Sequence, residues 1–333
     1  MVKLKWLAVA ELGIILILVS FILISHNKTV PNEVQSNYHG LLSPRVYSGL
    51  LEPKSFLIMN YAPLKENIEP FIRKNNISAS VYVENLRSGA LAGIDERISY
   101  PPASLNKVPT AMLIMKQVEK GELSLNQMIP IKDELRSNAY GDLYKTPEKE
   151  LELKVLLEAM LKESDDTAYK ILREYIKEED RGLLLAYLDY YSEDSVGSKE
   201  LGEESDFGIV TPKSMYNLFS SLYLSTVLEP KDSEYVLSLL TNTSFDVKKY
   251  AMLPEDVIVA QKFGLKYDEK QKYFHSCGII YSNDTRVFYC IMTKDLELET
   301  AKKLTGAIVN SIYAYVTDTR ERLDSYKEMY NFT

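Results

Sequence analysis

Residues 101–109 have the sequence Pro-Pro-Ala-Ser-Leu-Asn-Lys-Val-Pro. If Ser104 opens a helix, Lys107 lies one turn later on the same face, where its amine reaches the seryl oxygen. The helix N-terminus adds free backbone N–H groups and partial positive charge where an oxyanion would develop. The stretch therefore predicts a serine nucleophile that needs no histidine. Residues 25–28 are a second Ser-x-x-Lys copy, and for either copy the start of a surface helix is the alternative.

Two further polar motifs follow in the chain. Ser164, Asp165 and Asp166 come between two predicted helices, and Lys262 follows the apolar run at residues 257–261. A loop from a helical block and a lysine at the edge of a sheet can converge on Ser104 from opposite sides. We therefore expect a cleft at this junction.

With these motifs in this order, the chain resembles the class A β-lactamase and penicillin-binding serine hydrolase family, whose motifs are Ser-x-x-Lys, Ser-Asp-Asn and Lys-Thr-Gly. The resemblance covers about residues 62–318 and implies an α/β fold of the β-lactamase/transpeptidase type. In that fold a mostly antiparallel sheet is flanked by terminal helices, and an all-helical lobe, here about residues 104–212, is inserted. Further matching stretches are Ser-Ala-Ser-Val-Tyr-Val-Glu at 78–84, Glu-Ser-Asp-Asp-Thr-Ala at 163–168, Val-Thr-Pro-Lys-Ser-Met at 210–215 and Ser-Cys-Gly-Ile-Ile at 276–280.

The resemblance also implies roles for individual residues. Ser104 resembles the nucleophile, Lys107 its proton acceptor, and Ser164 the hydroxyl that passes a proton to the leaving group. Lys262 resembles the cation that holds this relay and the substrate, and the backbone N–H groups of Ser104 and Leu265 would form the oxyanion hole. A second cation nearby would lower the pKa of Lys107 and favour its neutral form.

The substrate-binding positions depart from the family pattern. Asp166 stands where the family has an asparagine that donates to the substrate, and an ionised carboxylate cannot donate. Phe263, between Lys262 and Gly264, replaces a hydroxyl residue that binds the substrate carboxylate. Cys277 stands where class A enzymes commonly have an arginine for the same anion. The chain therefore lacks two groups that would recognise a carboxylate.

The glutamate that supports hydrolysis in the family has no obvious counterpart. Glu200 is the candidate deacylating base. The alternative interpretation is that Glu200 belongs to a solvated acidic loop and has no catalytic role. Without such a base the acyl-enzyme would persist.

Composition excludes several other classes of function. The 333 residues include 47 acids and 39 bases, a formal charge of −8, so no basic excess is available to bind nucleic acid. Two cysteines and three histidines leave little for a metal site, and we expect no cofactor. The expected partner is a small-molecule or peptidoglycan-peptide substrate. His275 is near the predicted cleft, but a satisfied or exposed histidine is the simpler interpretation.

The two cysteines fall on neighbouring strands of a predicted hairpin. With a two-residue turn at 283–284, Ser282 faces Thr285 and Cys277 faces Cys290. Such facing residues lie within disulfide range. The pair is therefore either a disulfide or two half-buried thiols.

The first thirty residues contain a long apolar stretch. Residues 6–25 are apolar apart from Glu11, Ser20 and the last residue, Ser25, and lysines precede and follow them. Twenty helical residues rise about 30 Å, the thickness of the hydrocarbon core. We expect residues 1–28 to be a membrane anchor with its N-terminus inside, 29–61 a spacer, and 62–333 an extracytoplasmic domain. A cleaved signal peptide is the alternative.

Periodicity outlines the elements of the domain. Helical spacing occupies about residues 63–74, 108–120, 151–162, 168–175, 212–222 and the segment from 298, and strand patterns occupy 78–84, 257–263, 276–281 and 286–292.

Two functions fit this sequence. One is a membrane-anchored serine hydrolase that forms an acyl-enzyme on Ser104 with a β-lactam or a cell-wall peptide. The other is a non-catalytic binding or scaffolding module of the same fold.

Overall fold

The computed structural model describes residues 61–74, 77–187, 208–268, 271–282 and 285–329. The predicted anchor at 1–28, the predicted spacer apart from Tyr61, and Glu200 lie outside these residues. Within the described residues, no helix combines the length and the apolar character that crossing a membrane requires.

A five-stranded antiparallel sheet forms the centre of the domain, in the order β2-β1-β7-β6-β5. Strands from before and after the helical segment are neighbours in this sheet, because β1 pairs with β7. This arrangement confirms the predicted fold class. The strands are β1 (Ala79–Asn85), β2 (Leu91–Ile94), β5 (Ile258–Tyr267), β6 (Lys272–Ser282) and β7 (Thr285–Lys294).

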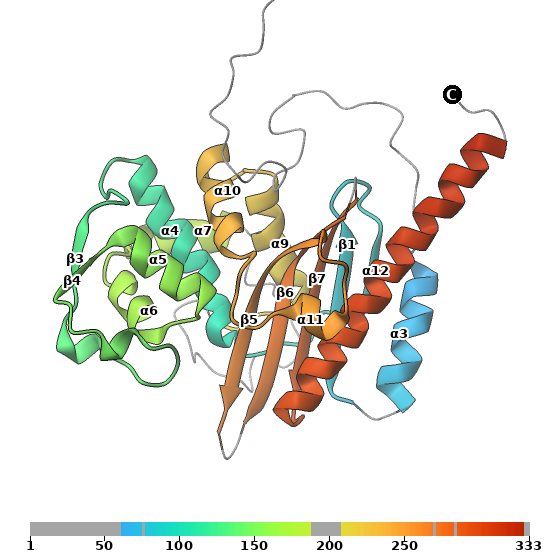
Figure 1. Ribbon diagram of the computed structural model, residues 1–333, viewed down its shortest axis with the longest axis horizontal. Helices are drawn as coiled ribbons and strands as arrows, with labels where there is room; N and C mark the ends of the chain where they lie inside the picture. The colour runs from blue at the N-terminus through green and yellow to red at the C-terminus, as the bar shows by residue number, and fades with distance from the viewer. Residues whose placement is uncertain (1–60, 75–76, 188–207, 269–270, 283–284, 330–333) are drawn as a thin grey trace, which may run out of the picture. The chain divides into compact units, whose positions relative to one another are not determined.

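Both faces of the sheet are covered, as the alternation along β7 shows. Phe288, Cys290 and Met292 pack in one hydrophobic cluster together with the helical lobe. The residues between them pack in a second cluster on the opposite face, with α3 (Ala62–Lys74) and α12 (Leu298–Met329). Figure 1 shows α3 and α12 side by side along the sheet, away from the green helices of the lobe.

The helical lobe begins with a short 3₁₀ helix, η2 (Ala103–Asn106), which leads into α4 (Lys107–Glu119). The predicted helices at 151–162, 168–175 and 212–222 are present with shifted ends. A two-stranded sheet, three α-helices and two 3₁₀ helices were not predicted, because their apolar patterns are short or interrupted. The remaining elements before β5 are β3 (Met128–Pro130), η3 (Asp133–Leu135), η4 (Leu143–Lys145), β4 (Glu150–Glu152), α5 (Leu153–Lys162), α6 (Asp166–Arg173), α7 (Glu178–Tyr187), α9 (Pro212–Tyr223), α10 (Pro230–Leu239) and α11 (Val247–Ala251).

The hairpin of β6 and β7 has the predicted register. Ser282 faces Thr285 and Cys277 faces Cys290, and the two sulfur atoms are bonded as a disulfide. The turn at 283–284 lies outside the described residues. Of the two alternatives for the cysteines, the structure has the disulfide.

Candidate active site

Ser104 is held on a tight turn rather than at the first turn of an α-helix. Ala103 before it has a positive φ of 47°, a conformation that costs a residue with a side chain and is typical of functional turns. Residues three apart in a 3₁₀ helix are nearly eclipsed, so Ser104 and Lys107 share a face. The predicted proximity is therefore correct, but its cause is the 3₁₀ turn, and α4 begins only at Lys107.

The amine of Lys107 is the centre of the polar cluster. Its Nζ atom lies 3.1 Å from Oγ of Ser104 and 3.2 Å from Oγ of Ser164, and it also donates to the carbonyl oxygen of Ser164. Lys107 is only 2% exposed, whereas Ser104 is partly exposed. One nitrogen thus links the two hydroxyl groups that the sequence predicts for nucleophile and relay.

The loop between α5 and α6 positions Ser164. Ser164 itself has a positive φ of 58°. The side chain of Asp165 accepts hydrogen bonds from the backbone of Ala168, where it caps α6, and from the backbone of Leu143, both at 2.9 Å. Asp165 therefore ties the loop to two segments of the lobe, which explains why an aspartate follows Ser164.

Asp166 pairs directly with the predicted base. Its Oδ1 atom lies 2.7 Å from Nζ of Lys107, and its side chain is 24% exposed. The backbone N–H of Asp166 donates to the carbonyl of Tyr140 at 3.0 Å. Asp166 is thus in contact with the polar cluster, but it accepts a hydrogen bond where the family asparagine would donate one.

Lys262 reaches the site from β5, an edge strand of the sheet. It is fully buried, and its Nζ donates to the carbonyl of Phe263 at 3.3 Å. Two residues further along, β5 borders the turn at Ser104: a Cβ on Gly264 would lie 2.9 Å from the carbonyl oxygen of Pro102. Leu265 follows and is partly exposed. The three predicted segments therefore meet.

The two lysines differ in their electrostatic surroundings. Burial lowers the pKa of Lys107, while the Asp166 carboxylate acts in the opposite direction. Burial, followed by repulsion from Lys107, lowers the pKa of Lys262 well below its ordinary value. The lowered pKa of Lys107 has the direction that we expected, with burial as its largest cause, and repulsion between the two lysines contributes to the shift of Lys262.

Two predicted substrate contacts need correction. Cys277 is fully buried and bonded to Cys290, so its sulfur is not available to a substrate. Phe263 is only 2% exposed, with its ring against Tyr140 and Phe245, so it is not open to a substrate.

His275 is buried, and its Nε2 atom forms a hydrogen bond with the carbonyl of Pro101 at 3.0 Å. For this nitrogen the interpretation of a histidine with a satisfied hydrogen bond is correct.

Two tyrosines at the site were not predicted. Tyr169 lies one turn after Asp166 on α6, and its ring centre is 5.7 Å from Nζ of Lys107. Helical spacing from the Ser164 motif is a signal that would have found it. Tyr140 meets Phe263 with ring centres 5.8 Å apart, and no local pattern connects residues so far apart in sequence.

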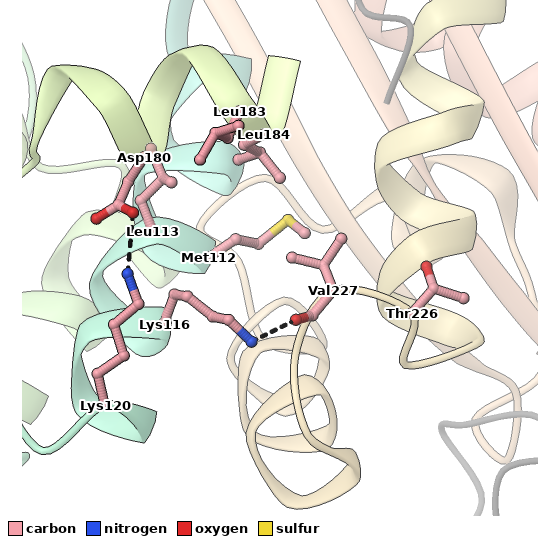
Figure 2. Close-up of a pocket in the computed structure, with 9 residues that line it drawn as sticks. All are labelled: Met112, Leu113, Lys116, Lys120, Asp180, Leu183, Leu184, Thr226 and Val227. Carbon is pink, nitrogen blue, oxygen red and sulfur yellow. Dashed lines mark hydrogen bonds and ion pairs between the residues drawn. The ribbon is translucent and has the colours of Figure 1, made fainter. Parts of the chain in front are cut away.

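Figure 2 shows a pocket of about 310 Å³ elsewhere in the lobe, which contains none of the predicted site residues. Its walls are mainly apolar side chains of α4 and α7 and the turn before α10. Both lysines of the pocket have partners: Lys120 donates a hydrogen bond to Asp180, and Lys116 donates one to the carbonyl of Val227. This pocket is separate from the Ser104 site.

Comparison with known proteins agrees with the geometry. A β-lactamase of Bacteroides uniformis is 23% identical over 236 residues, covering 65% of this chain and 77% of the relative. The β-lactamase VEB-1 of Pseudomonas aeruginosa is 23% identical over 218 residues, covering 59% and 70%.

Solved structures share the fold. The extended-spectrum β-lactamase TLA-3 superposes with a TM-score of 0.68 at 18% identity, over 76% of this chain and 98% of that one. PBP-A superposes with a TM-score of 0.66 at 17% identity, over 78% and 98%. Residues 63–316 match the family described as the Beta-lactamase enzyme family. The chain therefore belongs to the beta-lactamase enzyme family.

Proposed function

We propose that this protein is a serine acyl hydrolase or transferase that forms an acyl-enzyme on Ser104. The observation that carries the proposal is the position of Lys107 Nζ, within 3.2 Å of the hydroxyl oxygens of both Ser104 and Ser164. An amine in contact with both groups can accept a proton from one and return it through the other.

The proposed step balances as follows. Oγ of Ser104 bonds to the acyl carbon of the substrate while its proton passes to the neutral amine of Lys107. The bond from the acyl carbon to the leaving group then breaks, and the proton reaches the leaving group through Ser164. The backbone N–H groups of Ser104 and Leu265 are the proposed oxyanion hole. The family makes a β-lactam or a cell-wall peptide the candidate substrate, and a variant of PBP-A is known as an acyl-enzyme complex with penicillin G.

Release of the acyl group needs a base for water. Glu200 is the proposed candidate, and it lies outside the described residues. The hydrogen bonds described for Ser104 and Lys107 involve no glutamate. We therefore propose slow deacylation, which a burst of leaving group equal to the enzyme concentration, followed by slow turnover, would reveal.

Labelling of the full chain tests the acyl-enzyme. The protein is treated with a fluorescent fluorophosphonate and with a fluorescent penicillin, and the Ser104→Ala variant is treated in parallel. The proposal predicts an adduct with at least one probe in the wild type and none in the variant. Absence of a Ser104-dependent adduct with both probes contradicts it.

We also propose that residues 1–28 anchor the protein, with the domain outside the cytoplasm. The supporting feature is the apolar stretch at residues 6–25 with lysines at both ends. Cell fractionation and external protease treatment of the full chain test this. Recovery in the soluble cytoplasmic fraction contradicts the proposal.

A non-catalytic module is the second candidate. It is favoured by the Lys107–Asp166 ion pair, since this pair stabilises the charged form of the proposed base. If this candidate is correct, cells carrying Ser104→Ala have an unchanged phenotype, whereas the enzyme hypothesis predicts loss.

A further inference from the structure

The amine of Lys262 is covered by an aromatic ring. The Nζ atom lies 4.3 Å from the ring centre of Phe263, and the lysine side chain is fully buried. Among the residues that the structure describes, Lys262 forms no ion pair with a carboxylate. A substrate anion therefore cannot reach this nitrogen unless the ring moves.

The covering ring is itself fixed from both sides. The ring of Phe263 packs against Tyr140 of the helical lobe and Phe245 of the segment before α11, with ring centres 5.8 and 6.0 Å apart. Displacing the phenylalanine would therefore break contacts with both parts of the domain. The cover over Lys262 is built into the packing of the site.

Asp166 is a charged group that remains partly exposed at the site, and it is an acceptor. The carboxylate of Asp166 binds Lys107 through Oδ1, and its side chain is 24% exposed. A carboxylate accepts hydrogen bonds and repels other anions. The positive charge of Lys107 is already matched by this partner, so the site offers little attraction to an anionic substrate.

The neighbouring strand does not supply a cation. Cys277 lies directly opposite Lys262 in the β5–β6 register, and its sulfur is bonded to Cys290. The disulfide is buried and uncharged. Asp166 therefore repels a carboxylate at this site, and neither the covered Lys262 nor the uncharged disulfide beside it attracts one.

We propose that the substrate is an ester or amide with no carboxylate next to the bond that Ser104 attacks, and that it presents an N–H or ammonium donor toward Asp166. This inference rests on the proposed acyl-enzyme at Ser104. It narrows the substrate to acyl compounds whose acid group is masked as an amide or ester.

Matched penicillins provide the test. Benzylpenicillin and its methyl ester share the reactive ring and differ only in the carboxylate. The rate of Ser104 acylation in the full chain is measured for both by intact-protein mass spectrometry. We expect the methyl ester to react at least about tenfold faster, since the free acid meets the Asp166 carboxylate and finds the Lys262 amine covered. Equal rates, or a faster free acid, would overturn the inference.

Variants identify the residues responsible. Phe263→Thr uncovers Lys262 and adds a hydroxyl, so it is expected to raise the rate with the free acid relative to the ester. Phe263→Leu keeps an apolar cover and is expected to keep the wild-type preference. If Phe263→Thr does not fold, Asp166→Asn serves instead, because loss of this anion is expected to lower the ester preference. An unchanged ratio in the folded Thr or Asn variant would also overturn the inference.

The donor requirement has its own probe pair. The methyl ester of ampicillin carries an ammonium group that the methyl ester of benzylpenicillin lacks. We expect the ampicillin ester to acylate the wild type several-fold faster than the benzylpenicillin ester does. In the Asp166→Asn variant we expect the two esters to react at the same rate. No advantage in the wild type overturns this part of the inference. Failure of both the neutral fluorophosphonate and the penicillins to label Ser104 would instead show that the proposed function is wrong.

Discussion

Nζ of Lys107 lies 2.7 Å from Oδ1 of Asp166, closer than it lies to the hydroxyl of Ser104. This ion pair determines how readily Lys107 becomes a neutral base. Burial lowers the pKa of the lysine, and the carboxylate acts against that effect. The proposed base is therefore restrained by a carboxylate that the family motif lacks.

Replacement of Asp166 by asparagine is expected to release this restraint. Without the carboxylate the pKa of Lys107 falls further, so its neutral form is present at lower pH. The acidic limb of the pH profile for Ser104 labelling should move to lower pH, and the rate at pH 7 should rise by about tenfold. Stopped-flow labelling with a neutral fluorophosphonate measures both. A profile unchanged by the substitution would show that Lys107 is not the base.

Lys262 is expected to decrease stability at neutral pH. Its pKa in the folded protein is lowered well below the ordinary value, so the unfolded chain binds a proton that the folded one does not. Stability should therefore rise with pH in the window from the lowered pKa up to the ordinary value near 10.5. We predict that Lys262→Met raises the free energy of unfolding at pH 7 by about 1–3 kcal/mol.

Urea unfolding at pH 7 and pH 10 checks this prediction. The gain from Lys262→Met should shrink at the higher pH, because pH 10 is close to the ordinary pKa of 10.5 and protonation then stabilises the unfolded chain much less. A gain of equal size at both pH values would show that packing, rather than charge, is responsible. A loss of stability at pH 7 would contradict the prediction.

The approach of β5 to the nucleophile turn gives a third prediction. A Cβ on Gly264 would lie 2.9 Å from the carbonyl oxygen of Pro102, a backbone atom that cannot turn aside. Gly264→Ala should displace the Ser104 turn and slow labelling by about tenfold or more. Gly182→Ala on α7 is the matched control, since an added Cβ there meets nothing within 4 Å. Wild-type labelling rates in Gly264→Ala would be incompatible with this packing.

The sequence was sufficient to predict the contacts that depend on short spacing. Ser104 and Lys107 are three residues apart, and Cys277 and Cys290 are related by a tight hairpin, so local geometry alone brings each pair together. The segments of Ser164 and Lys262 were placed by the resemblance to a family. The contacts made by Phe263 could not be predicted in either way, because Tyr140 and Phe245 reach it from distant segments without a motif.

The charge effect of Asp166 could be predicted from its place in the motif, since a carboxylate beside Lys107 favours the ammonium form of that lysine. The structure has this contact, at 2.7 Å. The sequence could not give the extent of burial, which is the largest cause of the lowered pKa of both Lys107 and Lys262. Burial depends on how separate elements pack, which spacing does not encode.

His275 gives a prediction for acid stability. Burial lowers its pKa to about 4, from an ordinary value of 6.5. Between these values the unfolded chain binds a proton that the folded chain does not. The free energy of unfolding is therefore undiminished by this residue above pH 6.5 and decreases as the pH falls toward 4. The loss attributable to this residue is about 3 kcal/mol.

Chemical unfolding between pH 7 and pH 4 measures this loss. The His275→Gln variant retains a side-chain donor for the carbonyl of Pro101 and does not titrate, so its stability should fall less over the same range. Equal losses in wild type and variant would show that His275 is not the group responsible.

The most direct test of the central claim is to locate the covalent adduct within the chain. The full-length protein is treated in parallel with a penicillin, which would leave an acyl group, and with a neutral fluorophosphonate, which would leave a phosphonyl group. It is then digested and analysed by tandem mass spectrometry, together with the Ser25→Ala and Lys107→Met variants. The account predicts modification at Ser104 in the wild type and in Ser25→Ala, with strongly reduced modification in Lys107→Met. An unmodified Ser104, or equal modification when Lys107 is replaced, would contradict it.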